Sequence, residues 1–132
     1  MSNPYKPTGY NAVSPYFVVK GAQQLIDLLG EIFAVKILRR YDLPDGTIMH
    51  AELQLDDSVL MLGEASEQFP ANQHLVHVYV PDVDETYHKA LRAGCEAVEP
   101  PHQRQGDPDR RGTFKDFAGN FWSIGTQVST SP

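Results

Sequence analysis

The chain lacks a second cysteine, a long apolar run and an excess of basic residues. Its single cysteine, Cys95, cannot form an intrachain disulfide, and no cysteine-rich zinc motif is present. No stretch reaches the roughly 18 apolar residues that a membrane-spanning helix needs. The first residues also lack the basic start and apolar run of a signal peptide. These absences predict a cytoplasmic protein with no membrane partner.

Acidic residues outnumber basic ones, 17 to 11, which gives a formal net charge of −6 at neutral pH. Binding to nucleic acid or to an anionic membrane usually needs a basic surface, so the sequence predicts no nucleic-acid partner. A length of 132 residues suffices for one domain with its own core. We therefore expect residues 1–132 to form a single domain. Cys95 follows Gly94 at a predicted helix-to-strand junction, where a packed structural thiol is favoured over a catalytic one.

One pattern of elements occurs twice, over about residues 11–64 and again over about residues 74–127. In the first copy, a strand ending at Tyr16–Val19 leads into a helix that ends near Phe33. In the second copy, His77–Val80 leads into a helix that ends at Gly94, and each helix is followed by three strands. The repeat predicts an α+β fold of two βαβββ modules in a curved mixed sheet. Such modules have a concave face, and two of them can enclose a ligand cavity.

Periodicity and breakers define the parts of each module. Asp82, with Glu85 three residues later, is typical of a helix N-cap. Pro15 predicts an edge position or a bulge for the first strand. Prolines and charges over 99–112 predict a long loop between two strands of the second module. The first helix is expected to bury an apolar stripe formed by Ala22, Leu25, Ile26, Leu29, Ile32 and Phe33.

Four segments of the chain together resemble the vicinal oxygen chelate superfamily. They are residues 13–19, 45–53, 80–84 and 115–122, in this order over both repeats, and the resemblance covers about residues 8–127. The superfamily holds glyoxalase I, extradiol dioxygenases, and bleomycin and fosfomycin resistance proteins. The chain resembles a glyoxalase-like branch whose reaction is mostly unassigned. The resemblance implies a homodimer and a small-molecule ligand.

The resemblance also implies four positions for the customary metal ligands on the inner face of the sheet. They fall on Ser14, Met61, Leu75 and Ser123. A divalent cation at such a site needs imidazole, carboxylate or thiolate groups, which these residues do not supply. We therefore expect that the customary metal site is lost and that no cofactor is bound. Glu64 and His74 are near such positions but out of phase with the strand alternation.

Strand alternation predicts which side chains face the cavity. His50 and Glu52 lie two residues apart on one strand and so share a face. A histidine beside a carboxylate can act as a general acid or base, which makes this pair the best candidate for catalysis. A hydrogen-bonding role within the sheet, or a place at a dimer seam, remains the structural alternative. The other predicted ligand-binding residues are Tyr16, His77, Tyr79 and Phe121 on strands, and Arg111 in the long loop, where it could clamp an anion.

Three functions agree with these observations. The first is an uncharacterised glyoxalase-like protein that binds a small organic molecule between its modules without the customary metal. The second is a lyase, isomerase or dioxygenase with a metal relocated to His50, Glu52 and His77. The third is a bleomycin-type protein that sequesters a drug. The sequence leaves the ligand, and whether any reaction occurs, open.

Overall fold

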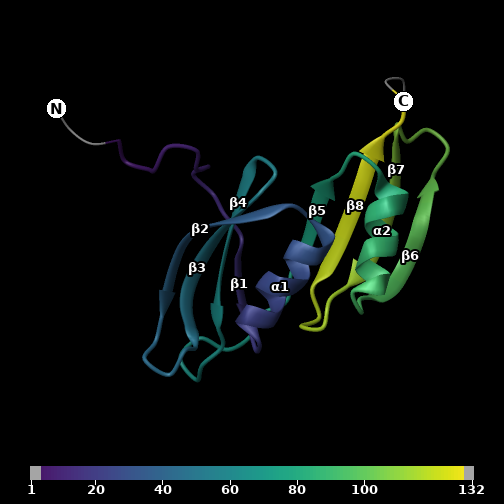
Figure 1. The fold of residues 1–132 in the computed structure, drawn as a ribbon. Helices are drawn as coiled ribbons and strands as arrows, with labels where there is room; N and C mark the ends of the chain where they lie inside the picture. The colour runs from purple at the N-terminus through teal and green to yellow at the C-terminus, as the bar shows by residue number, and fades with distance from the viewer. Residues whose placement is uncertain (1–3, 130–132) are drawn as a thin grey trace. The chain divides into compact units, whose positions relative to one another are not determined.

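The computed structural model describes residues 4–129, which fall into two compact units (Figure 1). Unit 1 joins the chain up to Gly30 with Ala34–Asn72, and unit 2 joins Glu31–Phe33 with the chain from Gln73 onward. Both units have the same order of elements, a strand, a helix and three further strands. The predicted α+β fold of two βαβββ modules is confirmed, with one four-stranded sheet in each.

Unit 1 contains one sheet with the strand order β1-β4-β3-β2. β1 runs parallel to β4, and the other neighbours are antiparallel. Pro15 stands just before the edge strand β1, where a missing N–H costs no ladder bond, and its carbonyl accepts from Met61 N–H at 3.0 Å. The elements are β1 (Tyr16–Val19), α1 (Ala22–Ile32), β2 (Val35–Asp42), β3 (Ile48–Leu55) and β4 (Ser58–Glu64).

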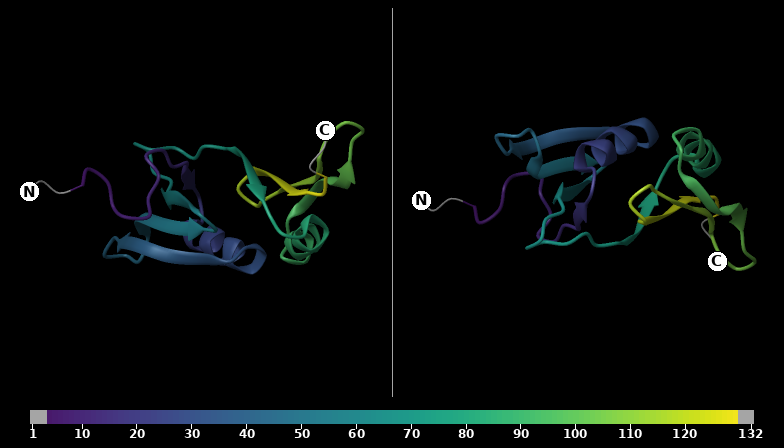
Figure 2. Two further views of the ribbon diagram at one scale, coloured as in Figure 1. Left: turned by 90° about the horizontal axis from the view of Figure 1, so that it is seen from above. Right: turned by 90° about the horizontal axis from the view of Figure 1, so that it is seen from below.

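Unit 2 repeats this topology with the strand order β5-β8-β7-β6. Its elements are β5 (Leu75–Tyr79), α2 (Val83–Arg92), β6 (Glu96–Gln103), β7 (Asp109–Lys115) and β8 (Phe121–Gln127). Helix α2 lies on one face of this sheet and contacts β6, β7 and β8 (Figure 2). The predicted N-cap is confirmed, because the Asp82 carboxylate accepts from Glu85 N–H at 3.2 Å.

Strand alternation separates the core face of each sheet from the face that carries the polar side chains. On β1, Phe17 and Val19 are fully buried, whereas Tyr16, the first residue of the strand, is 37% exposed. On β3, Ala51 and Leu53 are fully buried. The whole apolar stripe predicted for the first helix is also buried. No helix among residues 4–129 is long and apolar enough to cross a membrane.

The turn between β7 and β8 is built around a buried carboxylate. Asp116 is 5% exposed and accepts from Trp122 Nε1–H at 2.9 Å, Asn120 N–H at 3.0 Å and Ala118 N–H at 2.9 Å. Trp122 is fully buried and packs against the Phe33 ring at 5.7 Å between centroids. Trp122 is therefore a core residue of unit 2.

The prediction of a long loop over 99–112 is wrong. β6 continues to Gln103 and β7 begins at Asp109, so a short turn joins two paired strands. Pro100 and Pro101 fit because β6 is an edge strand and its pairing with β7 is irregular between Glu99 and His102. The prolines at these positions therefore mark an edge strand and not a loop.

Candidate functional site

Three side chains of unit 1 form a hydrogen-bonded chain on the face opposite the core. The Tyr16 hydroxyl lies 2.9 Å from His50 Nδ1, and His50 Nε2 lies 2.8 Å from Glu52 Oε2. The Tyr16 ring stacks on His50 at 5.5 Å between centroids, and Tyr41 of β2 stacks on the same imidazole at 6.2 Å. Contacts from β1, β2 and β3 therefore fix the orientation of the His50 ring.

Glu52 is the charged end of this chain and is only 6% exposed. Burial by itself raises the pKa of its carboxyl. The hydrogen bonds from His50 and from the Tyr10 hydroxyl, at 2.5 Å, outweigh burial and hold that pKa below its ordinary value. Arg39 Nε adds a weaker attraction at 3.7 Å. Glu52 is therefore an ionised carboxylate at neutral pH.

The negative charge of Glu52 determines where the protons lie along the hydrogen-bonded series Tyr16–His50–Glu52. Because Glu52 can only accept, the proton of neutral His50 lies on Nε2, and Nδ1 becomes the acceptor for the Tyr16 hydroxyl. Burial, followed by the charge of Glu52, raises the pKa of the Tyr16 hydroxyl. Tyr16 is therefore a protonated phenol at neutral pH, and it donates to His50 in the neutral tautomer of the ring.

The Tyr16–His50 bond crosses strand β4 at a glycine. A Cβ added to Gly63 would lie 3.2 Å from the Tyr16 hydroxyl and 2.7 Å from the carbonyl oxygen of Met49. The second distance is shorter than real Cβ atoms tolerate, so a side chain at this position would force the backbone apart. Glycine is needed here for the two strands to approach, and it leaves the Tyr16 hydroxyl uncovered on this side.

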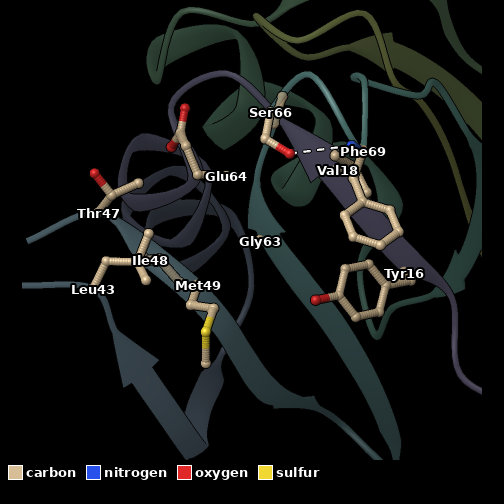
Figure 3. A pocket seen from close by; sticks show the side chains of 11 residues that line it. Tyr16, Val18, Leu43, Thr47, Ile48, Met49, Gly63, Glu64, Ser66 and Phe69 are labelled. Carbon is tan, nitrogen blue, oxygen red and sulfur yellow. Dashed lines mark hydrogen bonds between the residues drawn. The ribbon is translucent and has the colours of Figure 1, made fainter.

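A pocket of about 570 Å³ opens beside Tyr16 and Gly63 (Figure 3). Its size lies within the range of small-molecule sites. Tyr16 and Phe69 both line the pocket, and in Figure 3 the Tyr16 hydroxyl is directed toward the side where Met49 lies. The lining side chains are mostly apolar; they are Tyr16, Val18, Leu43, Ile48, Met49, Ala65 and Phe69, with Thr47, Glu64 and Ser66 as polar members.

The loop that carries Phe69 is held in place by its own hydrogen bonds. Ser66 N–H donates to the Phe69 carbonyl at 2.9 Å, and Phe69 N–H donates to Ser66 Oγ at 3.1 Å. At the end of the loop, the Asn72 side chain accepts from Val18 N–H at 2.9 Å and donates to the Tyr16 carbonyl at 3.3 Å. These bonds fasten the loop along β1 and close one wall of the pocket.

Glu64 on the pocket wall is already engaged by helix α1. Its two carboxylate oxygens accept from Gly21 N–H and Ala22 N–H, each at 2.9 Å. These are unpaired donors at the start of the helix, where a negative charge also interacts favourably with the helix dipole. Glu64 therefore serves α1 as a cap supplied by a neighbouring strand.

Unit 2 carries a second network, centred on Arg111. The guanidinium donates to Asp107 and to Asp109, each at 2.8 Å, and Nη1 lies 3.2 Å from His77 Nε2. Tyr79 donates its hydroxyl to the buried Asp109 at 2.6 Å. Burial, and then the charge of Arg111, lowers the pKa of His77. His77 is therefore a neutral acceptor at neutral pH.

The predicted site residues fall into these two networks and the pocket, except Phe121, which belongs to none of them. Tyr16 lines the pocket, whereas His50 and Glu52 stand behind its hydroxyl. Arg111 does not lie in a loop, because residues 109–115 form strand β7, and its guanidinium is bound by two carboxylates of its own unit. Tyr79 and Phe121 are 60% and 37% exposed on unit 2. Their roles in ligand binding stay predictions.

Most of the pocket was missed by reasoning from the sequence. Ile48 and Met49 both line it because the pairing of β2 with β3 shifts between Tyr41 and Asp42, which breaks simple alternation. Nothing in the sequence marks that shift. Phe69 gave the clearest signal that could have been used, since an aromatic side chain in a polar loop indicates a covered or ligand-facing position.

The four customary metal positions do not fit a divalent cation. They offer two hydroxyls, a thioether and an aliphatic group, at Ser14, Met61, Leu75 and Ser123. No group of three or more His, Cys, Asp or Glu within residues 4–129 has an arrangement that could hold a metal ion. Loss of the metal remains a prediction. The thiol of Cys95 is buried, which raises its pKa to about 11 and makes it a poor nucleophile.

The fold and the pocket define an α+β protein of two βαβββ modules with a cavity of small-molecule size. The model of the Glyoxalase/Bleomycin resistance protein/Dioxygenase superfamily matches residues 11–124, and the chain belongs to this family.

Relatives in two mycobacteria are uncharacterised. A protein of Mycobacterium bovis is 30% identical over 128 residues, which cover 89% of this chain and 84% of the relative. A protein of Mycobacterium tuberculosis is also 30% identical over 128 residues, covering 89% of this chain and 75% of the relative. These relatives support the family and leave its activity in this branch open.

Solved structures of lower identity share the fold. TioX from Micromonospora sp. ML1 has a TM-score of 0.70 at 22% identity, over 88% of this chain and 99% of TioX. The fosfomycin resistance protein FosX from Mesorhizobium loti has a TM-score of 0.63 at 14% identity, over 88% of this chain and 91% of FosX. At these identities the likeness shows the fold alone.

Proposed function

We propose that the chain binds a small, largely apolar organic molecule in the pocket of unit 1. The observation that carries this proposal is the pocket itself, about 570 Å³ in volume and walled by aromatic and aliphatic side chains. A polar hydrogen-bonded chain ends at one side of it, at the Tyr16 hydroxyl. A mostly apolar wall with a small number of placed polar groups is typical of sites that bind small organic molecules.

The exposure of the lining residues supports the same function. Phe69 and Met49 are 62% and 55% exposed, although both are large and apolar. A ligand seated between them would remove this surface from water, at roughly 25 cal/mol for each Å² of apolar area. The hydrogen bonds of Ser66 and Asn72 hold the Phe69 loop in place, so little ordering cost would oppose binding.

Methionine methyl groups provide a direct test of this pocket. The chain has three methionines, of which Met49 lines the pocket and Met61 does not. Protein with isotope-labelled methionine methyl groups is titrated with a library of neutral aromatic and aliphatic compounds, and the methyl resonances are followed by NMR. We expect a subset of compounds to shift the Met49 resonance in a saturable way.

A matched pair of phenylalanines separates pocket binding from general adhesion. Phe69 lines the pocket and is 62% exposed, whereas Phe117 lies in a turn of unit 2 and is 43% exposed. Phe69→Ala is expected to weaken binding about tenfold, for loss of about 1–2 kcal/mol of apolar contact, while Phe117→Ala leaves it unchanged. A library in which no compound shifts Met49, or equal losses in both variants, would contradict the proposal.

Two further properties belong to this proposal as predictions from the sequence. One is a homodimer, which sedimentation or light scattering of the purified chain can test against the mass of 14.7 kDa for a monomer. The other is a cytoplasmic location. Binding in the unit 1 pocket does not depend on either of them, because every lining residue lies in unit 1.

A further inference from the structure

We infer that Tyr16, His50 and Glu52 form a proton-transfer site for the molecule bound in the unit 1 pocket. The substrate class that fits is a small neutral aldehyde or ketone with a C–H bond next to its carbonyl group. The inference rests on the proposed function, because the pocket has to hold the substrate. Tyr16 is the residue that touches the substrate, and His50 and Glu52 act through it.

The Tyr16 hydroxyl lies where a molecule in the pocket can reach it. Tyr16 belongs to the pocket wall, and its hydroxyl stands beside Gly63, which has no side chain to cover it. The space that a Cβ of Gly63 would occupy is 3.2 Å from the hydroxyl oxygen. Gly63 is itself part of the pocket lining, so a ligand there can approach the phenol oxygen.

The hydrogen-bond chain behind Tyr16 gives this hydroxyl somewhere to send its proton. His50 Nδ1 accepts from Tyr16 at 2.9 Å, and His50 Nε2 donates to Glu52 at 2.8 Å. An imidazolium formed at His50 would lie between a phenolic oxygen and a buried carboxylate, which stabilises the positive charge. The arrangement has the logic of a carboxylate–histidine–hydroxyl triad, with a phenol in the place of the serine.

The proposed step balances without a further reactant. The C–H bond of the substrate breaks, and its proton passes to the Tyr16 oxygen as the Tyr16 proton passes to His50 Nδ1. The electron pair of the C–H bond stays on the substrate as an enolate. Return of the protons restores Tyr16 and His50 and delivers hydrogen to the same carbon, which gives exchange with solvent.

The pocket favours a neutral carbonyl compound over a charged one. Its walls are mostly apolar, and an unpaired charge placed there would lose its hydration. The acid on the wall, Glu64, is already bound to the start of α1. Ser66 accepts from Phe69 N–H through its oxygen, a bond that does not use its hydroxyl proton, and that proton can be donated to a carbonyl oxygen.

The other charged and titratable groups around the chain support the same direction of transfer. Tyr41 of β2 faces His50, and Tyr10 and Arg39 face Glu52. Tyr10 and Arg39 both stabilise the Glu52 carboxylate, so the proton that His50 takes up does not continue to Glu52. Glu52 is therefore a positioning residue, and its removal is expected to alter the pH profile as well as the rate.

Hydrogen exchange provides the test without knowledge of the natural substrate. Cyclohexanone, acetophenone and phenylacetaldehyde are incubated with the protein in deuterium oxide, and loss of the proton signal next to the carbonyl is followed by NMR. Compounds that shift the Met49 methyl resonance are expected to exchange faster than in buffer. Tyr16→Phe should reduce the protein-dependent rate about a hundredfold, in line with the usual contribution of general acid–base catalysis. Glu52→Gln should reduce it and displace its pH profile.

The controls separate this inference from the proposed function. Tyr87→Phe removes one phenol from helix α2 of unit 2 and is expected to leave exchange unchanged. Tyr16→Phe keeps the ring, so binding reported by Met49 should persist while exchange is lost. Binding without protein-dependent exchange, or exchange unaffected by Tyr16→Phe, overturns the inference and leaves the binding function standing. A failure of every compound to shift Met49 overturns both.

Discussion

Units 1 and 2 have equivalent strand orders, and each has a side-chain contact to a histidine across one strand. The charged groups around the two histidines differ. In unit 1 the Tyr16–His50 bond of 2.9 Å crosses β4 at Gly63. In unit 2 the Arg111–His77 contact of 3.2 Å crosses β8, where Gly125 pairs with Arg111 and a Cβ on Gly125 would lie 3.2 Å from His77 Nε2. A glycine on the strand between two partners thus recurs in both sheets.

The partners of the two histidines decide what each network can do. His50 stands between a phenol and a buried carboxylate, and one ring nitrogen contacts each of them. His77 faces a guanidinium that is itself fixed by two carboxylates, so a proton on its ring would meet a like charge. One backbone arrangement therefore supports two different networks. The His50 network suits proton transfer, whereas in the His77 network the charge of Arg111 opposes protonation of the histidine.

The largest expected difference between the units is in how much the turns that precede β4 and β8 contribute to the free energy of unfolding. Unit 1 turns through Asp56 and Asp57, both exposed, whereas unit 2 turns around the buried Asp116. Asp116→Ala removes the buried carboxylate that accepts from Trp122 Nε1–H, Asn120 N–H and Ala118 N–H. We expect it to lower the free energy of unfolding by about 3 kcal/mol or more, whereas Asp57→Ala changes it by less than about 0.5 kcal/mol. Urea denaturation followed by Trp122 fluorescence measures both, and similar losses in the two variants would show that the buried carboxylate has no special weight.

The two helices differ in where their N-terminal caps come from. Helix α2 is capped by Asp82, its own neighbour in sequence, while α1 is capped by Glu64 from β4. Glu64→Ala removes an acceptor for two helix N–H groups together with a favourable charge, and it is expected to cost about 1–2 kcal/mol. Asp82→Ala removes an acceptor for one group and should cost about 1 kcal/mol. Chemical denaturation of both variants provides the comparison, and an Asp82→Ala loss that exceeds the Glu64→Ala loss would contradict the assignment of Glu64 as the α1 cap.

The repeat, the helical stripe and the local cap could be read from the sequence because each depends on residues close together in the chain. The cap on α1 could not, because Glu64 and Gly21 are joined only by the pairing of β1 with β4. The strands over 99–112 were missed for a similar reason. Pro100 and Pro101 break a central strand but are tolerated at an edge, and the sequence does not state which strand is at the edge.

The candidate site was predicted in part. The proximity of His50 and Glu52 followed from alternation along one strand, and the structure places their side chains 2.8 Å apart. The partners that complete the chain, Tyr10 and Arg39, come from a segment before β1 and from the edge strand β2, and no local pattern links them to Glu52. Pocket residues such as Met49 depend on an irregular register that only the folded sheet reveals.

The smallest expected effect concerns the pH dependence of the His77–Arg111 network of unit 2. Burial and Arg111 lower the pKa of His77, so its Hε1 resonance should titrate below the ordinary histidine value of about 6.5. The unfolded chain then binds more protons than the folded one as pH falls through that value. Stability contributed by neutral His77 is present above it and is lost as pH falls toward the folded pKa.

Replacing Arg111 with methionine provides the matched variant for this titration. Arg111→Met removes the cation that faces His77 and leaves Asp109, whose charge raises the histidine pKa. The NMR midpoint of His77 is therefore expected to rise relative to the unmodified chain, while the resonances of His50 in unit 1 stay where they were. An unchanged His77 midpoint in Arg111→Met would mean that burial alone sets its protonation, and the electrostatic contrast between the two networks would then rest on the Glu52 carboxylate of unit 1.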